Sequence, residues 1–228
     1  MKTTLKAWPC GTGACKFLHI FTAACCQLRT NEYFCRSYTP KIHMTEKKHG
    51  NPAVVGLAGF GLTTLLLQFH NIGLMGLGPV VAMGFIFGGL AQMLAGFQEQ
   101  KTGNNFGYSA FTSYGAFWIC LAVIFLLNHY GIYKSGTVEV GCFLIVWTIY
   151  TAIMFVGSMR TNGMLAFTFL TLLLGFIGLD LAHFGYPAMT KIAAIDLIIC
   201  AASAWYIMAH VIFADLGINL PVGKPWMK

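Results

Sequence analysis

Hydrophobic residues beyond residue 50 fall into long runs that are separated by short polar or glycine-rich stretches. A helix needs about 20 mainly apolar residues to cross the hydrocarbon core of a bilayer, and each run is about that long. The pattern predicts six membrane-spanning helices, at residues 52–71, 79–98, 108–128, 138–158, 163–184 and 190–213. Because the connections are short, consecutive helices should run antiparallel and form one all-α transmembrane bundle without a soluble domain.

The first predicted helix has a start signal at Asn51-Pro52-Ala53. Asn is a strong N-cap because its side-chain oxygen can accept from the unpaired amides of the first turn, and Pro at the first helical position loses no hydrogen bond. We therefore expect the helix to begin at residue 51 or 52. Its free amides would also favour a small anion nearby, although a well-capped helix alone explains the same residues.

Composition supports a membrane protein. Hydrophobic residues make up 57% of the 228-residue chain and charged residues only 9%, whereas a soluble domain has about 25% charged residues. The net charge is +7, but six of the 14 Lys and Arg residues precede Met44 and the others are scattered, which argues against a nucleic-acid partner. The cysteines indicate neither a disulfide framework nor a zinc site, and no other metal or cofactor motif is present.

The chain is expected to have three parts. Residues 1–50 form an N-terminal extension that is either disordered or lies upstream of a true start at Met44, with a signal peptide as an alternative that lacks a clear cleavage site. Residues 51–215 form the six-helix domain, and residues 216–228 form a cytoplasmic C-terminal tail. From Met44 onward, Lys and Arg residues next to the helices favour the side of the N-terminus by six to two, which predicts that both termini are cytoplasmic.

Two helix faces are marked by residue spacing. A stripe of small residues on the second helix predicts close helix packing, and it consists of Gly84, Gly88, Ala91 and Ala95. A partly polar stripe on the first helix consists of Phe60, Thr64, Gln68 and Asn71. Polar groups in hydrocarbon must face protein or water, so the polar stripe on the first helix is either a contact between helices or the lining of an aqueous path.

The remaining candidates are aromatic or ionisable. Tyr114 and Trp118 share a face of the third helix, which fits packing as well as a narrow point that passes a small polar solute. Asp180 and His183 near the end of the fifth helix, with Asp196 in the sixth, fit either a proton relay or an aqueous interface. No nucleophile–base pair, phosphate loop or ligand cluster indicates an enzyme.

Seven motifs occur in an order that carries a family resemblance. They are Asn51-Pro52-Ala53 with Gly56-Leu57, Phe60-Gly61, His70-Asn71, Gly88-Gly89-x-x-Gln92-x-x-Ala95-Gly96, Glu99, Gly103-Asn104-x-Phe106-Gly107 and Ala110-Phe111-x-Ser113-Tyr114-Gly115-x-Phe117-Trp118. Together they resemble the acetate uptake transporter family, which includes the succinate–acetate permeases. The match is dense over residues 51–118 and looser up to about residue 215. It departs from the family at Val54 and Val55, where the usual signature has Pro and Leu.

The resemblance implies a multi-pass protein of the cell membrane that transports acetate and related small monocarboxylates, with succinate as a further candidate. It implies proton symport and a homohexamer in lipid in which each protomer has its own path. The alternatives are a passive anion channel for small carboxylates and a membrane sensor or assembly protein without flux. An aquaporin is rejected, because water channels need Asn-Pro-Ala twice and this chain has it once.

The resemblance also implies site residues. Phe60, Tyr114 and Leu172 would form a hydrophobic constriction that acts as a gate. The expected substrate entrance and path consist of Asn51, Pro52, Ala53, Gly56, Leu57, Thr64, Gln68, Asn71, Gln92 and Asn104. The candidates for a proton relay are Glu99, Asp180 and His183.

Overall fold

The structure is a computed structural model that describes residues 50–228; the expected N-terminal extension up to residue 49 and its Met44 start lie outside the described residues. Within the described range the chain contains helices and loops and no strand. The elements are α2 (Ala53–Asn71), α3 (Gly78–Phe85), the π-helix η1 (Ile86–Ala91), α4 (Gln92–Lys101), α5 (Asn105–His129), α6 (Thr137–Ser158), α7 (Gly163–His183) and α8 (Met189–Asp215).

Six helical spans in residues 50–228 are long and apolar enough to cross a membrane. The elements α3, η1 and α4 form one continuous span, Gly78–Lys101, and each of the other helices is a span by itself. The predicted all-α class and the six helices are confirmed, with boundaries that differ from the expected ones by at most three residues. The protein is therefore a multi-pass membrane protein.

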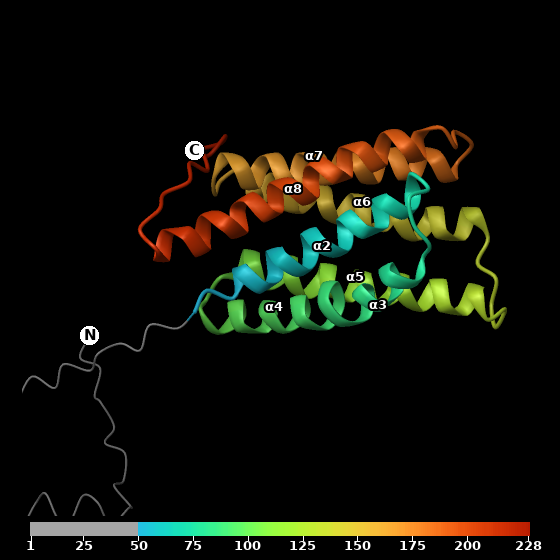
Figure 1. Cartoon of the computed structure of the whole chain (residues 1–228). Helices are drawn as coiled ribbons and strands as arrows, with labels where there is room; N and C mark the ends of the chain where they lie inside the picture. The colour runs from blue at the N-terminus through green and yellow to red at the C-terminus, as the bar shows by residue number, and fades with distance from the viewer. Residues whose placement is uncertain (1–49) are drawn as a thin grey trace, which may run out of the picture. The chain divides into compact units, whose positions relative to one another are not determined.

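The six spans lie alongside one another in one bundle (Figure 1). Contacts run from α2 to α8, from α8 to α7 and from α7 to α6, while the α3–η1–α4 span packs between α2 and α5. Contacts between α5 and α6 complete the ring. Because the connections are short, the start of α2 and the end of α8 lie at the same end of the bundle, with the starts of α5 and α7.

The start of α2 differs slightly from the expected one. The helix begins at Ala53, and Asn51 precedes it by two residues instead of occupying the first turn. The Asn51 side chain still accepts a hydrogen bond from the Ala53 amide at 2.9 Å, so it pairs one of the free donors as predicted. The Val54 amide donates to the Asn51 carbonyl at 3.3 Å, a bond that the proline of the family signature cannot make.

The predicted stripe of small residues on the second span is wrong as a single face. The π-helix Ile86–Ala91 interrupts the α-helix and changes the register between Gly84 and the residues that follow. Gly84 approaches Trp118 and Ala122 of α5, whereas Gly88 approaches Thr63 of α2. The small residues therefore serve two different helix contacts.

A polar cluster closes the connection between α5 and α6 at the other end of the bundle. Glu139 in the first turn of α6 accepts from the Gly136 amide at 2.9 Å and from the Tyr133 hydroxyl at 2.9 Å. The hydrogen bond and the negative charge of Glu139 raise the pKa of the exposed Tyr133 hydroxyl. This cluster lies at the opposite end of the bundle from the start of α2. A substitution in it can therefore serve as a control for experiments on the end where α2 begins.

Candidate functional site

Two cavities lie one after the other inside the bundle, and they share three lining residues. Phe60 of α2, Tyr114 of α5 and Leu172 of α7 line both cavities. Each of these side chains is buried. The three residues thus lie where the two spaces adjoin, and we refer to them as the neck. They are the same three residues that were expected at a constriction.

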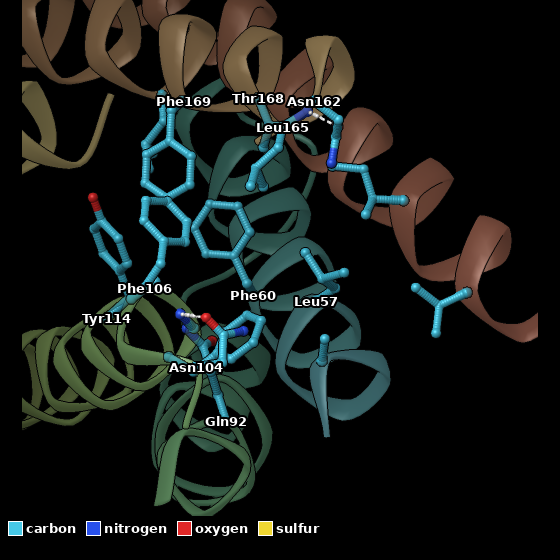
Figure 2. Close-up of a pocket in the computed structure, with 17 residues that line it drawn as sticks. Leu57, Phe60, Gln92, Asn104, Phe106, Tyr114, Asn162, Leu165, Thr168 and Phe169 are labelled. Carbon is cyan, nitrogen blue, oxygen red and sulfur yellow. Dashed lines mark hydrogen bonds between the residues drawn. The ribbon is translucent and has the colours of Figure 1, made fainter. Parts of the chain in front are cut away.

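The larger cavity lies at the end of the bundle where α2 begins and has a volume of about 140 Å³. A cavity of about this size can hold a ligand as large as benzene, so a two-carbon acid fits. Figure 2 shows its residues converging from helices that are distant in the sequence. Apart from the neck residues, its lining consists of Ala53, Leu57, Gln92, Asn104, Phe106, Gly107, Ala110, Phe111, Asn162, Leu165, Thr168, Phe169, Ile207 and Val211.

The neck is held by aromatic packing and one buried hydrogen bond. The rings of Phe60 and Tyr114 lie 6.0 Å apart, and Phe169 and Tyr150 pack on Tyr114 at 6.3 and 5.6 Å. The hydroxyl groups of Tyr114 and Thr151 form a hydrogen bond of 2.8 Å, which fixes the ring against α6. The neck is therefore lined by two apolar side chains and by a tyrosine whose hydroxyl is already paired.

Gln92 is the distinctive polar group of the larger cavity. Its side chain is 0% exposed to outside solvent, and within the described residues neither of its amide atoms has a hydrogen-bond partner. A buried polar group that pairs with no protein group is uncommon and calls for a ligand or water as its partner. Because Gln92 lines the cavity (Figure 2), its amide can donate to an oxygen of a bound solute.

Asn104 and Glu99 form a second polar group beside this cavity. Asn104 caps α5 by accepting from the Gly107 amide at 3.1 Å, and its amide nitrogen donates to Glu99 at 2.7 Å. Glu99 is only 3% exposed, and its second carboxyl oxygen has no partner in the described part of the chain. The sequence Gly103-Asn104-x-Phe106-Gly107 is therefore a helix start that also presents Asn104 at the cavity.

The smaller cavity lies beyond the neck and has a volume of about 30 Å³, which is room for one or two water molecules. Thr64, Gln68 and Trp118 supply its polar groups. The amide nitrogen of Gln68 donates to the Thr64 carbonyl at 3.2 Å, and Asn71 donates to Gln68 at 2.9 Å. The polar stripe of α2 therefore faces the protein interior and, in part, this cavity.

Comparison with known proteins identifies the family. A sequence profile of the GPR1/FUN34/yaaH family matches residues 34–218, which is more than half of the chain. This chain belongs to that family.

Individual relatives agree with the family assignment. The succinate-acetate/proton symporter SatP of Escherichia coli (strain K12) is 40% identical over 186 residues, covering 79% of this chain and 99% of SatP. Acetate permease A of Emericella nidulans is 34% identical over 180 residues, covering 70% of this chain and 60% of the permease. A solved structure of the bacterial acetate channel SatP is 39% identical with a TM-score of 0.74, and covers 77% of this chain and 100% of that one. These relatives are transporters or channels, not enzymes.

In this GPR1/FUN34/yaaH family member, the expected path residues separate into three groups. Ala53, Leu57, Gln92 and Asn104 line the larger cavity, and Thr64 and Gln68 line the smaller one. The other four, Asn51, Pro52, Gly56 and Asn71, line neither cavity. Among these, Gly56 has a structural reason: a Cβ atom there would come within 2.6 Å of the Phe111 ring, so glycine lets this cavity-lining ring pack on α2.

The three candidates for a proton relay are not brought together. Glu99 lies beside the larger cavity, whereas Asp180 and His183 lie near the end of α7, at the opposite end of the bundle. Asp180 accepts from the Thr148 hydroxyl at 2.7 Å, and His183 contacts the Leu179 carbonyl through Nδ1 at 2.8 Å. A single relay through all three residues is therefore not supported by their positions.

Sequence reasoning missed most of the wall that α7 and α8 contribute. Asn162, Leu165, Thr168 and Phe169 come from the first turns of α7, and Ile207 and Val211 come from α8. The Asn162 side chain caps α7 by accepting from the Leu165 amide at 2.9 Å. A capping asparagine at the same end of the bundle as Asn104 was the available signal.

Proposed function

We propose that this protein carries acetate and related small monocarboxylates across the cell membrane, with succinate as a further substrate. The observation that supports this best is the pair of cavities joined at the neck of Phe60, Tyr114 and Leu172, with the unpaired Gln92 amide in the larger one. Relatives that are described as a succinate-acetate symporter, an acetate permease and an acetate channel support the same substrate class.

The proposed passage follows from the chemistry of the substrate. A carboxylic acid with a pKa of about 4–5 is almost wholly ionised at neutral pH and crosses lipid poorly in that form. The larger cavity receives the anion, where Gln92 replaces part of its hydration by donating a hydrogen bond. In either direction of transport, the apolar neck favours passage of an acid that has lost its water or has gained a proton.

Proton symport is the proposed mode, and the likeness to a succinate-acetate/proton symporter supports it. A passive channel is the alternative, and the likeness to a solved acetate channel supports that alternative. Purified protein in vesicles should take up labelled acetate faster when the outside is acidified, measured against protein-free vesicles that report diffusion of the neutral acid. A symporter that moves one proton with each anion moves no net charge, so an imposed membrane potential should not change uptake. Uptake that follows the potential and ignores the proton gradient would establish the channel. Uptake equal to that of protein-free vesicles would favour the remaining alternative, a membrane sensor or assembly protein without flux.

Replacing Gln92 by Leu should weaken acetate binding. A hydrogen bond to a charged group contributes about 1.5–3 kcal/mol, which corresponds to about a 10- to 100-fold rise in the half-saturating acetate concentration. Acetate-dependent counterflow in vesicles would measure this change. Thr112→Val is the matched control, because it removes a buried unpaired hydroxyl that lines neither cavity. Equal half-saturation in the Gln92→Leu variant and the unaltered protein would remove Gln92 from the proposed site.

Orientation and assembly belong to the same proposal. The end of the bundle with the larger cavity carries Lys101, Arg160 and Lys224, whereas the opposite end has Lys134 and Lys191. This distribution supports a cytoplasmic location for the larger cavity and both termini.

The outer face of α6 is strongly apolar and exposed, with Val146 at 65% and Ile153 at 66%. Such a face suits lipid or neighbouring copies, and we propose a homohexamer with one path in each protomer.

A further inference from the structure

The segment after α8, residues 216–228, folds back onto the bundle, and we refer to it as the C-terminal strap. Gly217 and Gly223 have φ angles of +81° and +73°, in the left-handed region that glycine adopts without strain, and they allow the chain to reverse. The strap is fixed to α8 at two points. Nδ1 of His210 lies 2.6 Å from the Leu220 carbonyl, and the Tyr206 hydroxyl donates to the Pro221 carbonyl at 2.9 Å.

The strap then continues past the start of α7, near which the C-terminus lies in Figure 1, and reaches the end of α6. The Met164 amide, in the first turn of α7, donates to the Val222 carbonyl at 2.7 Å. The amides of Trp226 and Met227 both donate to the Met159 carbonyl, at 2.9 and 3.0 Å. The Trp226 ring also packs edge-on against Phe155 of α6 at 6.3 Å. The strap therefore connects the C-terminal ends of α6 and α8 with the start of α7.

The residues that hold the strap alternate with residues that line the larger cavity. On α8, Tyr206 and His210 hold the strap, while the next residue after each, Ile207 and Val211, lines the cavity. On α7, Met164 holds the strap, and its neighbours Asn162 and Leu165 line the cavity. The same helical turns therefore touch the strap on one face and the cavity on another. The position of these turns is therefore shared by the strap contacts and the cavity wall.

We propose that the C-terminal strap is a positioning element for substrate size: it holds the α7–α8 wall of the larger cavity in place and so limits the carboxylic acids that enter. This inference rests on the proposed transport of small carboxylates. Most of the strap lies beyond residue 218, where the match to the family profile ends. None of the hydrogen bonds that hold the strap in the described structure involves a neck residue, so its effect should fall on the larger cavity and not on the neck.

The test compares uptake of labelled butyrate with that of labelled acetate in vesicles that contain the full chain. The double variant Tyr206→Phe/His210→Ala removes both anchors on α8, and a second variant lacks residues 220–228. Since one methylene is discriminated about tenfold or more in a tight apolar site, loosening the wall should raise the butyrate-to-acetate ratio by about three- to tenfold. Tyr133→Phe is the matched control, because it removes a tyrosine hydroxyl bond at the opposite end of the bundle and should leave the ratio unchanged.

Hydrogen exchange of the Met164 amide reports independently whether the strap has been released. Faster exchange in the double variant together with a higher ratio supports the proposal. Faster exchange with an unchanged ratio overturns it, as does an unchanged ratio in the shortened protein. Unchanged exchange in the double variant would show that the α8 anchors do not hold the strap, which also contradicts the proposal. Failure of the proposed function looks different, because the unaltered chain would then transport neither acid.

Discussion

Replacing Phe60 by Ala should make the protein accept larger acids, with the butyrate-to-acetate uptake ratio rising about tenfold or more. Phe60 lines both cavities and its ring faces Tyr114 across the neck at 6.0 Å. Removing the ring joins the two spaces and leaves room for extra methylenes, each of which is worth about 1–3 kcal/mol of discrimination in an apolar site. Uptake should be divided by the amount of folded protein, because truncating a buried Phe also costs about 3–5 kcal/mol of stability.

Phe106→Ala is the control for this experiment. Phe106 is a ring of the same size that lines the larger cavity only, and it packs edge-on against Phe169 at 5.4 Å. Its removal enlarges the larger cavity without opening the neck, so the uptake ratio should rise by no more than the roughly three- to tenfold expected for a loosened α7–α8 wall, and by less than in Phe60→Ala. If both variants change the ratio equally, or if Phe60→Ala does not change it, the neck is not the point of size selection.

The helices of this chain could be predicted almost completely from the sequence, because the membrane makes hydrophobic length the dominant signal. Turn residues between the runs then fixed the boundaries closely. Asn104 and Asn162 each cap a helix with their side chains, and Gly73, Gly103 and Gly131 have positive φ angles directly after helices. These helix-end signals depend only on neighbouring residues, so they can be recognised before the fold is known.

The site could be predicted only in part. The stripe from Phe60 to Gln68 lies on a helix with few polar residues, so the polar ones reveal the inward face of α2. Along α7 and α8 almost every position is apolar, so the sequence does not distinguish a residue that faces the cavity, such as Ile207, from one that faces outward, such as Ile199. The bond between Tyr114 and Thr151 joins positions 37 residues apart and depends on how α5 and α6 pack.

The π-helix is the feature that the sequence indicated least. Its residues, Ile86–Ala91, continue the hydrophobic pattern of an ordinary helix, and the small residues around it give an uninterrupted stripe if an α-helical period is assumed. The π-helix immediately precedes Gln92, so it helps to determine which face of the second span carries this residue into the larger cavity. Its geometry depends on a neighbour in α2, where Gly59 approaches the Phe87 backbone.

Replacing Gly59 by Leu should therefore prevent the protein from folding correctly, and Gly59→Ala should destabilise it clearly. A Cβ atom at residue 59 would lie 2.5 Å from the Phe87 carbonyl oxygen, which belongs to the π-helix backbone and cannot rotate away as a side chain can. Overpacking of this kind costs about 1–3 kcal/mol, which exceeds the gain of up to about 1 kcal/mol from exchanging Gly for Ala in a helix. Thermal unfolding and size-exclusion chromatography of the detergent-solubilised protein would measure the loss.

The comparison that isolates this contact is Gly76→Ala. Gly76 lies in the connection between α2 and α3, and a Cβ atom there would meet nothing within 4 Å, so the same substitution should leave the unfolding temperature nearly unchanged. A Gly59→Ala protein as stable as the Gly76→Ala protein would mean that α2 and η1 can separate without cost. In that case the π-helix would not depend on Gly59, and the position of Gln92 would have to be held by the contacts of α4 with α5 instead.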